Sequence, residues 1–288
     1  MSNENSVLNG NSVLDETIDD WIGSPPLVFH ELQNALNNPD LSFAEVDPII
    51  RTDPNLAARL LKIANSSFYG LDTKVKTITH ALSIVGIQSV IEMALATIMV
   101  QVFKGIPKEL VDMQSFWKHS IACGLAAREI GKNLLLDNVD SLYTAGMLHD
   151  LGSLIIYQGN PKKAKKILTR CQSEGLVLSK VEDEVIGFNH AQIGAFLFEK
   201  WGLAPSLVEA VRFHHEPSKA REFLLDAAIL HTADFITYKM NFGIEKRLIL
   251  PDVDTEAVRM VDVGLDTLPC IRNAVNRQIE EILSLFKD

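Results

Sequence analysis

Apolar side chains recur every three or four residues along most of the chain, and short polar breaks separate these runs. This spacing places the apolar positions on one face of an α-helix, where they can pack against a neighbouring helix. We find no convincing run of alternating apolar and polar residues, which would indicate a β-strand. The pattern therefore predicts an all-α protein built by packing one apolar stripe of each helix.

Residues that favour helix starts precede the first apolar runs: Ser24-Pro25-Pro26, Ser42 in a capping box with Glu45, Asp53-Pro54, and Thr77. Gly86 closes the helix that begins at Thr77, and a longer helix follows to about Phe103. Gly105 and Pro107 then mark the clearest candidate linker. The remaining expected helices cover approximately residues 112–131, 138–149, 161–174, 180–186, 190–201, 205–215, 222–241, 254–261 and 268–286.

Charge and composition narrow the function classes. The 37 acidic residues outnumber the 27 basic ones, and the net charge of −10 disfavours broad nucleic-acid binding. A basic run at residues 162–166 is more typical of a solvated helix face. Three scattered cysteines predict no disulfide framework, and the polar start of the chain is not typical of a signal peptide. The longest apolar stretch, residues 90–103, is too short to span a bilayer. We therefore expect a soluble, cytoplasmic protein.

His149-Asp150 marks the centre of the candidate chemistry. The pair lies in the segment AGMLHDLG, where an apolar helix runs into a glycine-containing turn. Burying such groups without partners costs several kcal/mol, so they need hydrogen bonds or a metal ion. Further histidines and an aspartate occupy expected helix positions between residues 119 and 234. The full candidate set is His119, His149, Asp150, His190, His214, His215 and Asp234.

Imidazole and carboxylate ligands together suit Fe, Mn, Zn or Ni, and one carboxylate can bridge two ions. Two ions about 3.5–4 Å apart are the usual arrangement for phosphoester hydrolysis. Counting donors gives two sets that share Asp150. The first metal would be held by His119, His149, Asp150 and Asp234. The second would be held by Asp150, His190, His214 and His215.

A competing interpretation is a hydrogen-bonded cluster without metal, inherited from an enzyme ancestor. His30, His80 and His231 are expected outside the ligand set, because a lone histidine is usually an ordinary core or surface residue. His231 precedes Asp234 by one helical turn and could form a hydrogen bond near the site.

These residues resemble the HD superfamily of metal-dependent phosphohydrolases and, more narrowly, the HDOD family of bacterial signalling output domains. The resemblance runs from about residue 21 to about residue 238. It rests on Pro25-Pro26-Leu27, Asp53-Pro54-Asn55-Leu56, residues 59–70, Thr79-His80-Ala81-Leu82, Val85-Gly86, Trp117 with His119-Ser120, residues 145–152, Glu184 with Gly187 and His190, and Trp201-Gly202-Leu203 with His214-His215.

The resemblance implies an HD-like helical bundle with an additional N-terminal helical subdomain. It divides the chain into a flexible tail at 1–20, the N-terminal helical subdomain at 21–105, the metal-site core at 106–241 and a C-terminal helical extension at 242–288. It also favours iron among the candidate metals.

A sister family, HD-GYP, cleaves cyclic di-GMP, and its metal ligands match all seven candidate residues. This sequence departs from that family at three places. Ser153 stands where a lysine follows the HD motif, no Gly-Tyr-Pro follows Glu216, and Ser115 aligns with a further glutamate ligand. The first two changes remove groups that would hold and polarise a cyclic dinucleotide. The third argues against a third metal.

Two functions from different classes follow. The first is a signalling or scaffolding module, favoured because the substrate-binding motif is missing. Its two divalent ions would be structural or would sense redox state or a ligand, and its surface would contact a signalling protein partner.

The second is an active metal-dependent phosphohydrolase acting on nucleotide or cyclic-dinucleotide phosphoesters. Its candidate phosphate contacts are Lys118, Arg212, Lys219 and Arg221. Nucleic-acid binding through a helix pair ranks below both functions because of the acidic balance. The last apolar helix could pack internally or form a homodimer.

Overall fold

The computed structural model describes residues 27–36, 38, 40–66, 69–103, 105–242, 249, 253–264 and 267–285. Within these ranges the regular elements are helices, and the one β pairing is an isolated bridge between Val177 and Ile249, which confirms the predicted all-α class. The α-helices are α2 (Leu27–Leu36), α3 (Phe43–Arg51), α4 (Pro54–Ala64), α5 (Ile78–Val85), α6 (Ile87–Val102), α7 (Met113–Asn133), α8 (Val139–Leu148), α9 (Leu151–Gly159), α10 (Pro161–Glu174), α11 (Leu178–Ile186), α12 (His190–Lys200), α13 (Pro205–Phe213), α14 (Leu224–Lys239), α15 (Thr255–Met260) and α16 (Thr267–Leu285).

Local capping explains why several helices begin where the sequence predicts. The backbone N–H of Ser42 donates to the Glu45 carboxylate at 2.9 Å, as the capping box requires. The Asp53 carboxylate accepts from the backbone N–H groups of Asn55 and Leu56 at the start of α4. These side chains satisfy amide groups that the first turn of a helix leaves without partners.

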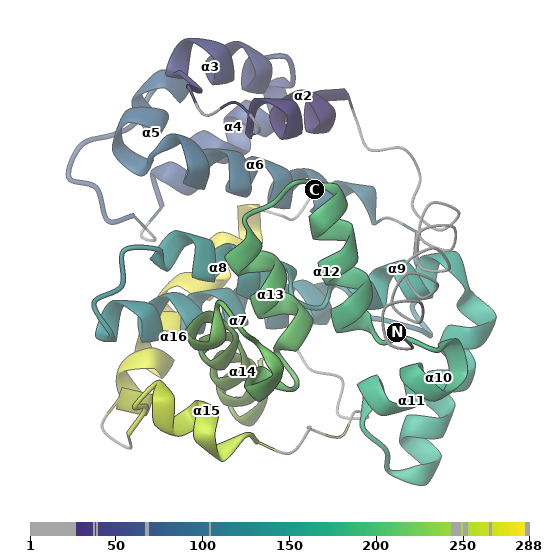
Figure 1. The fold of residues 1–288 in the computed structure, drawn as a ribbon. Helices are drawn as coiled ribbons and strands as arrows, with labels where there is room; N and C mark the ends of the chain where they lie inside the picture. Colours follow the sequence, from purple (N-terminus) through teal and green to yellow (C-terminus); the bar gives the residue numbers. More distant parts are fainter. Residues whose placement is uncertain are drawn as a thin grey trace, which may run out of the picture.

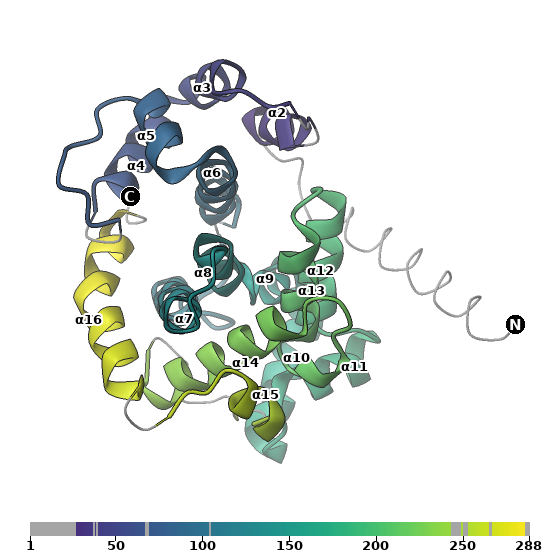
Figure 2. The ribbon, with the colours of Figure 1, turned by 60° about the vertical axis from the view of Figure 1, so that its left-hand side comes forward.

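Two central helices, α7 and α8, pack side by side and are surrounded by α6, α14 and α16 (Figure 2). A pair of glycines allows their close approach. A Cβ atom built on Gly146 would lie 2.6 Å from the backbone nitrogen of Gly124, so a methyl group does not fit at this crossing. The backbones of α7 and α8 can therefore meet directly, and both helices reach the candidate site.

The N-terminal helices α2–α6 lie together on one side of the molecule and contact the rest through α6 on α8 and α4 on α16 (Figure 1). Most buried apolar side chains form one cluster that runs from Val28 to Leu283, and Ala64, Val75 and Ala81 form a second, small cluster. The predicted division into subdomains stays a prediction, and the predicted tail at 1–20 lies outside the described residues. The apolar face of α16 packs against α7 within the same chain, which is the internal alternative for this helix.

Helix α9 is a difference from the sequence prediction, which expected a turn after the His149-Asp150 pair. All of its residues from Leu151 to Tyr157 are buried, so no amphipathic period is visible. No single described helix is long and apolar enough to cross a membrane. By length and composition only, one pair, Ile78–Val85 with Ile87–Leu95, could do so jointly, with a bend of 115° between its members.

Candidate metal centre

All seven candidate side chains meet in one cluster, although they come from five places in the chain. His119 lies in α7 and Asp234 in α14, whereas the others stand at helix ends. His149 and Asp150 lie between α8 and α9, His190 opens α12, and His214-His215 follows α13. The ends of α8, α12 and α13 therefore contribute five of the seven side chains. Their roles as ligands stay a prediction.

Asp150 stands between two groups of histidines. Its Oδ2 atom lies 3.2 Å from Nε2 of His149 and 3.8 Å from Nε2 of His119. Its Oδ1 atom lies 3.3 Å from Nε2 of His190 and 3.9 Å from Nε2 of His214. Each carboxylate oxygen therefore faces a separate set of imidazoles, which is the arrangement that a bridging carboxylate needs.

Each half of the cluster has a further donor. In the first half, Oδ1 of Asp234 lies 3.0 Å from Nε2 of His119 and 3.7 Å from Nε2 of His149. In the second half, Nε2 of His215 lies 2.8 Å from Nε2 of His190. Two nitrogens bound to one metal at about 2.1 Å each lie about 3.0–3.4 Å apart, so a small shift of the two rings would let them share an ion.

Backbone carbonyls fix the orientation of two imidazoles. The Nδ1–H of His149 donates to the carbonyl of Gly146 at 2.8 Å, and that of His214 donates to the carbonyl of Val211 at 2.7 Å. Both hydrogen bonds point the Nε2 atom into the cluster. His231 lies outside the donor set, as expected. Its ring bridges the carbonyl of His214 at 2.7 Å and the backbone N–H of Asp254 at 2.9 Å.

Glu182 contacts the cluster, although it was not among the residues predicted from the sequence. It lies in α11, is fully buried, and accepts from Nδ1 of His190 at 2.6 Å and from the backbone N–H of His190 at 2.9 Å. Glu184, which carried the family resemblance, instead pairs with Arg170 at 2.8 Å on the surface. A carboxylate behind a ligating histidine orients the ring and raises its basicity. The missed signal was an acidic residue at a core position of α11.

Cys123 is the second residue that the sequence analysis did not include. Its side chain is buried, and its Sγ atom lies within 4.8 Å of donor atoms of His149 and Asp234. Burial, together with Asp234 and Asp150, raises the pKa of this thiol well above its usual value. A signal was available, because Cys123 follows His119 by four residues on the same helix face.

The charges of the cluster are strongly coupled. Burial opposes protonation of His149 and His190, but Asp150 beside the first and Glu182 beside the second outweigh it and raise each pKa to about 9. Burial alone would raise the pKa of Asp150, but the adjacent histidines hold it well below its usual range. Burial and the charges of His149 and His190 lower the pKa of His214 to about 3. His214 therefore presents a neutral ring with a free lone pair.

One buried ring nitrogen of the cluster lacks a hydrogen-bond partner, which is a feature expected of a metal ligand. The Nε2 atom of His214 is buried and has no hydrogen-bond partner among the described residues, although its Nδ1 atom is satisfied. A buried acceptor without a partner is costly, and a metal ion would remove that cost. Five imidazoles and two carboxylates fit Fe, Mn, Zn or Ni.

Three of the four candidate phosphate contacts form ion pairs with glutamates. Lys118 pairs with Glu280 at 2.8 Å, Arg212 with Glu199 at 2.8 Å, and Lys219 with Glu216 at 2.7 Å. The fourth candidate, Arg221, is exposed. Ser153 is buried in α9 and brings no charge to the cluster. Among the described residues, the ion-pair partners of Asp150 and Asp234 are all histidines.

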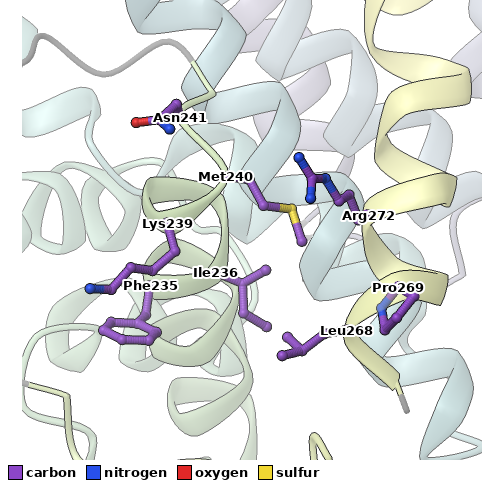
Figure 3. Close-up of a pocket in the computed structure, with 8 residues that line it drawn as sticks. All are labelled: Phe235, Ile236, Lys239, Met240, Asn241, Leu268, Pro269 and Arg272. Atoms are coloured by element: carbon purple, nitrogen blue, oxygen red, sulfur yellow. The ribbon is translucent and has the colours of Figure 1, made fainter. Parts of the chain in front are cut away.

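A separate pocket of about 400 Å³ lies between α14 and α16 (Figure 3). Apolar side chains such as Ile236, Met240 and Leu268 line it, and Lys239 and Arg272 also contribute to its wall. None of the seven clustered residues lines this pocket, although Asp234 belongs to the same helix. The pocket is therefore distinct from the candidate metal centre.

The profile of the HDOD domain matches residues 22–217 of the chain. The chain belongs to the HDOD family. The match covers the six positions of the cluster up to His215, and Asp234 lies beyond it.

Individual relatives extend the comparison. The chain is 29% identical over 210 residues to an uncharacterized protein of Treponema pallidum, covering 72% of this chain and 40% of that protein. It is 31% identical over 128 residues to ribonuclease Y of Geobacter sulfurreducens, covering 43% of this chain and 18% of the enzyme. The solved structure of a candidate phosphohydrolase of Shewanella amazonensis has a TM-score of 0.74 and 25% identity, covering 95% of this chain and 98% of that one. The chain thus spans about two fifths of its Treponema relative.

Proposed function

We propose that this HDOD domain is a regulatory module that holds two divalent metal ions and acts through contact with a signalling protein rather than through turnover of a substrate. His119, His149, Asp150 and Asp234 would hold one ion. Asp150, His190, His214 and His215 would hold the other. Iron is the first candidate, and Mn, Zn and Ni are the alternatives that the donor chemistry allows.

One observation carries the metal part of this proposal. The two oxygens of Asp150 face different imidazole sets, at 3.2 Å from His149 and 3.3 Å from His190. A cluster that only satisfied hydrogen bonds would have no need for the unpartnered Nε2 atom of His214. The empty-cluster alternative therefore explains this atom less well.

The cations around the site support a regulatory role. Phosphoryl chemistry normally uses Lys or Arg side chains, or metal ions, to stabilise charge on the phosphate oxygens. Here three of the four candidate cations form ion pairs with glutamates, and Ser153 replaces the lysine of the related hydrolases. A metal pair would supply charge and an activated water, but three of the four protein cations that would contact a phosphoester are paired with glutamates.

Metal content tests the first part. The full chain, purified without added metal and again after iron loading under anaerobic conditions, should contain two ions per chain by mass spectrometry of the metals. His149→Ala should lose the ion of the first half, because its Nε2 atom would be a ligand there. His30→Ala is the matched control, since His30 is exposed on α2 and belongs to no donor group. Loss of metal in both variants, or its absence from the loaded wild-type chain, would contradict the proposal.

A turnover assay tests the second part. The metal-loaded chain should hydrolyse none of a panel containing cyclic and linear dinucleotides, nucleoside monophosphates and a short single-stranded RNA. The RNA is included because ribonuclease Y is among the relatives.

The rival function, a metal-dependent phosphohydrolase, is favoured by one observation. The Asp150 side chain is 23% exposed, so solvent reaches the carboxylate that would bridge the two ions. Turnover that requires metal, disappears in His149→Ala and survives in His30→Ala would establish the rival and overturn the regulatory proposal.

A further inference from the structure

Cys123 is a buried cysteine whose side chain lies beside two residues of the candidate metal centre. It lies in α7 one turn after His119, and its side chain has no measurable exposure. Its Sγ atom, a ring nitrogen of His149 and a carboxylate oxygen of Asp234 all lie within 4.8 Å of one another. A buried cysteine that only fills space usually contacts apolar groups. This thiol faces two groups of the candidate ligand set.

The local geometry suits a metal ligand. Bonds of about 2.0–2.3 Å place neighbouring donor atoms on one ion about 3–3.7 Å apart, so small side-chain shifts would bring this trio onto one ion. Residues four apart lie on the same helix face, so α7 offers the His119 nitrogen and the Cys123 sulfur on adjacent turns. The thiol makes no hydrogen bond within the part of the chain that the structure describes. No competing contact therefore has to be broken.

We propose that Cys123 is a thiolate ligand of the metal ion held by His119, His149, Asp150 and Asp234. Binding breaks the S–H bond, forms a metal–sulfur bond and releases the proton to solvent. The two halves of the centre are then unequal. The first half includes a soft sulfur donor, which favours iron, zinc or cobalt over manganese and magnesium, whereas the second half offers only imidazoles and a carboxylate. This inference rests on the proposed metal-holding role.

Cobalt(II) is the probe that separates the two ideas. The metal-free full chain is titrated with cobalt(II) without oxygen, and its absorption is followed in the visible and the near ultraviolet. Ligand-field bands in the visible report cobalt bound by any donors. A thiolate-to-cobalt charge-transfer band in the near ultraviolet reports sulfur ligation specifically. We expect both bands in the wild-type chain and loss of the charge-transfer band alone in Cys123→Ser.

The two other cysteines provide the controls. Cys171 is buried in α10 and Cys270 is exposed on α16, and neither belongs to a donor group around the cluster. The double variant Cys171→Ser/Cys270→Ser keeps Cys123 as its single thiol and should keep the full charge-transfer band. This variant tests the assignment even if Cys123→Ser does not fold.

Each remaining outcome decides the matter. Visible bands without a charge-transfer band in the wild-type chain would overturn the role of Cys123 and leave the metal centre standing. A charge-transfer band that disappears in the double variant would assign sulfur ligation to another cysteine and overturn the inference. Absence of both bands would overturn the metal-holding role and this inference together.

Discussion

At the scale of a single residue, Glu182 contacts the outer side of a candidate ligand, His190. Its carboxylate holds both the backbone N–H and the Nδ1–H of His190, so the Nε2 lone pair of this ring has one possible direction. The carboxylate is fully buried, and its second oxygen has no hydrogen-bond partner among the described residues. Burying a carboxylate is costly unless it is paired and hydrogen-bonded. His190 provides that pairing, and the same contact fixes the orientation of its imidazole.

We therefore expect Glu182→Gln to weaken metal binding at the half formed by His190, His214 and His215. Loss of a carboxylate behind a ligating histidine typically lowers metal affinity about 10–100-fold. Competition with a chromophoric chelator should resolve this loss as a change in one of two binding steps. Glu184→Gln, two residues away on α11 but paired with Arg170 on the surface, should leave both steps unchanged. Equal affinities for the two variants would show that Glu182 has no such role.

Glu92 is a second buried carboxyl, and it lies far from the candidate ligands in sequence. It belongs to α6, which packs against α8, and accepts from the Gln88 amide at 2.9 Å. Burial raises the pKa of this carboxyl to about 7. The folded chain therefore keeps a proton on Glu92 between about pH 4.5 and pH 7, where the unfolded chain has lost it. Stability from this group is lost as the pH rises through that window.

The matching prediction concerns Glu92→Gln, which cannot ionise. Relative to this variant, the wild-type chain should lose about 3 kcal/mol of unfolding free energy between pH 4.5 and pH 7.5, since each pKa unit is worth about 1.4 kcal/mol. Urea unfolding at several pH values measures the difference, and contributions from the histidine cluster cancel because both chains contain it. Glu109→Gln, at an exposed position, should run parallel to wild type. A pH-independent difference for Glu92→Gln would refute the raised pKa.

At the scale of elements, the junction of α9 and α12 decides whether Asp150 can reach His190. Gly152 lies in the first turn of α9, directly against the backbone of His190. A Cβ atom built on Gly152 would lie 2.0 Å from the His190 carbonyl oxygen. This contact involves backbone rather than a flexible side chain, so a substitution must move one helix away from the other.

Gly152→Ala should therefore lower the unfolding free energy by about 1–3 kcal/mol, the usual cost of overpacking, and should also reduce metal content. Gly194→Ala is a matched control within α12. A Cβ atom at Gly194 would find its nearest neighbour at an ordinary 3.5 Å, and alanine favours a helix over glycine by about 0.5–1 kcal/mol. This variant should be neutral or more stable. Denaturant unfolding and metal analysis of both proteins check the contrast.

The same elements show what can be predicted from sequence. Helix starts such as Asp53-Pro54 are predictable because capping involves residues two or three apart. Helix α9 was not predicted, because a helix buried on all sides has no polar face and Gly152 suggested a turn. The seven clustered residues were predicted from their types and their family resemblance. Glu182 was not, because its contact with His190 depends on how α11 packs beside α12.

At the scale of the whole molecule, the cluster ties together helices that are distant in sequence. Its donors come from α7 and α14 and from the ends of α8, α12 and α13, while the same helices contribute to one continuous core. An unfolded chain cannot assemble such a set of donors. Metal binding therefore favours the folded state, and its free energy adds to the stability of the entire core.

Chelation should accordingly lower the melting temperature of the metal-loaded chain. A ligand present at 100 times its dissociation constant stabilises the folded state by about 2.7 kcal/mol, which corresponds to about 5–10 °C for a chain of this size. Differential scanning calorimetry with and without chelator measures the shift. His149→Ala should show a smaller shift than wild type because it lacks one of the two ions, whereas His30→Ala should respond as wild type does. A wild-type chain that melts identically with and without chelator would mean that the buried cluster is held together by hydrogen bonds alone.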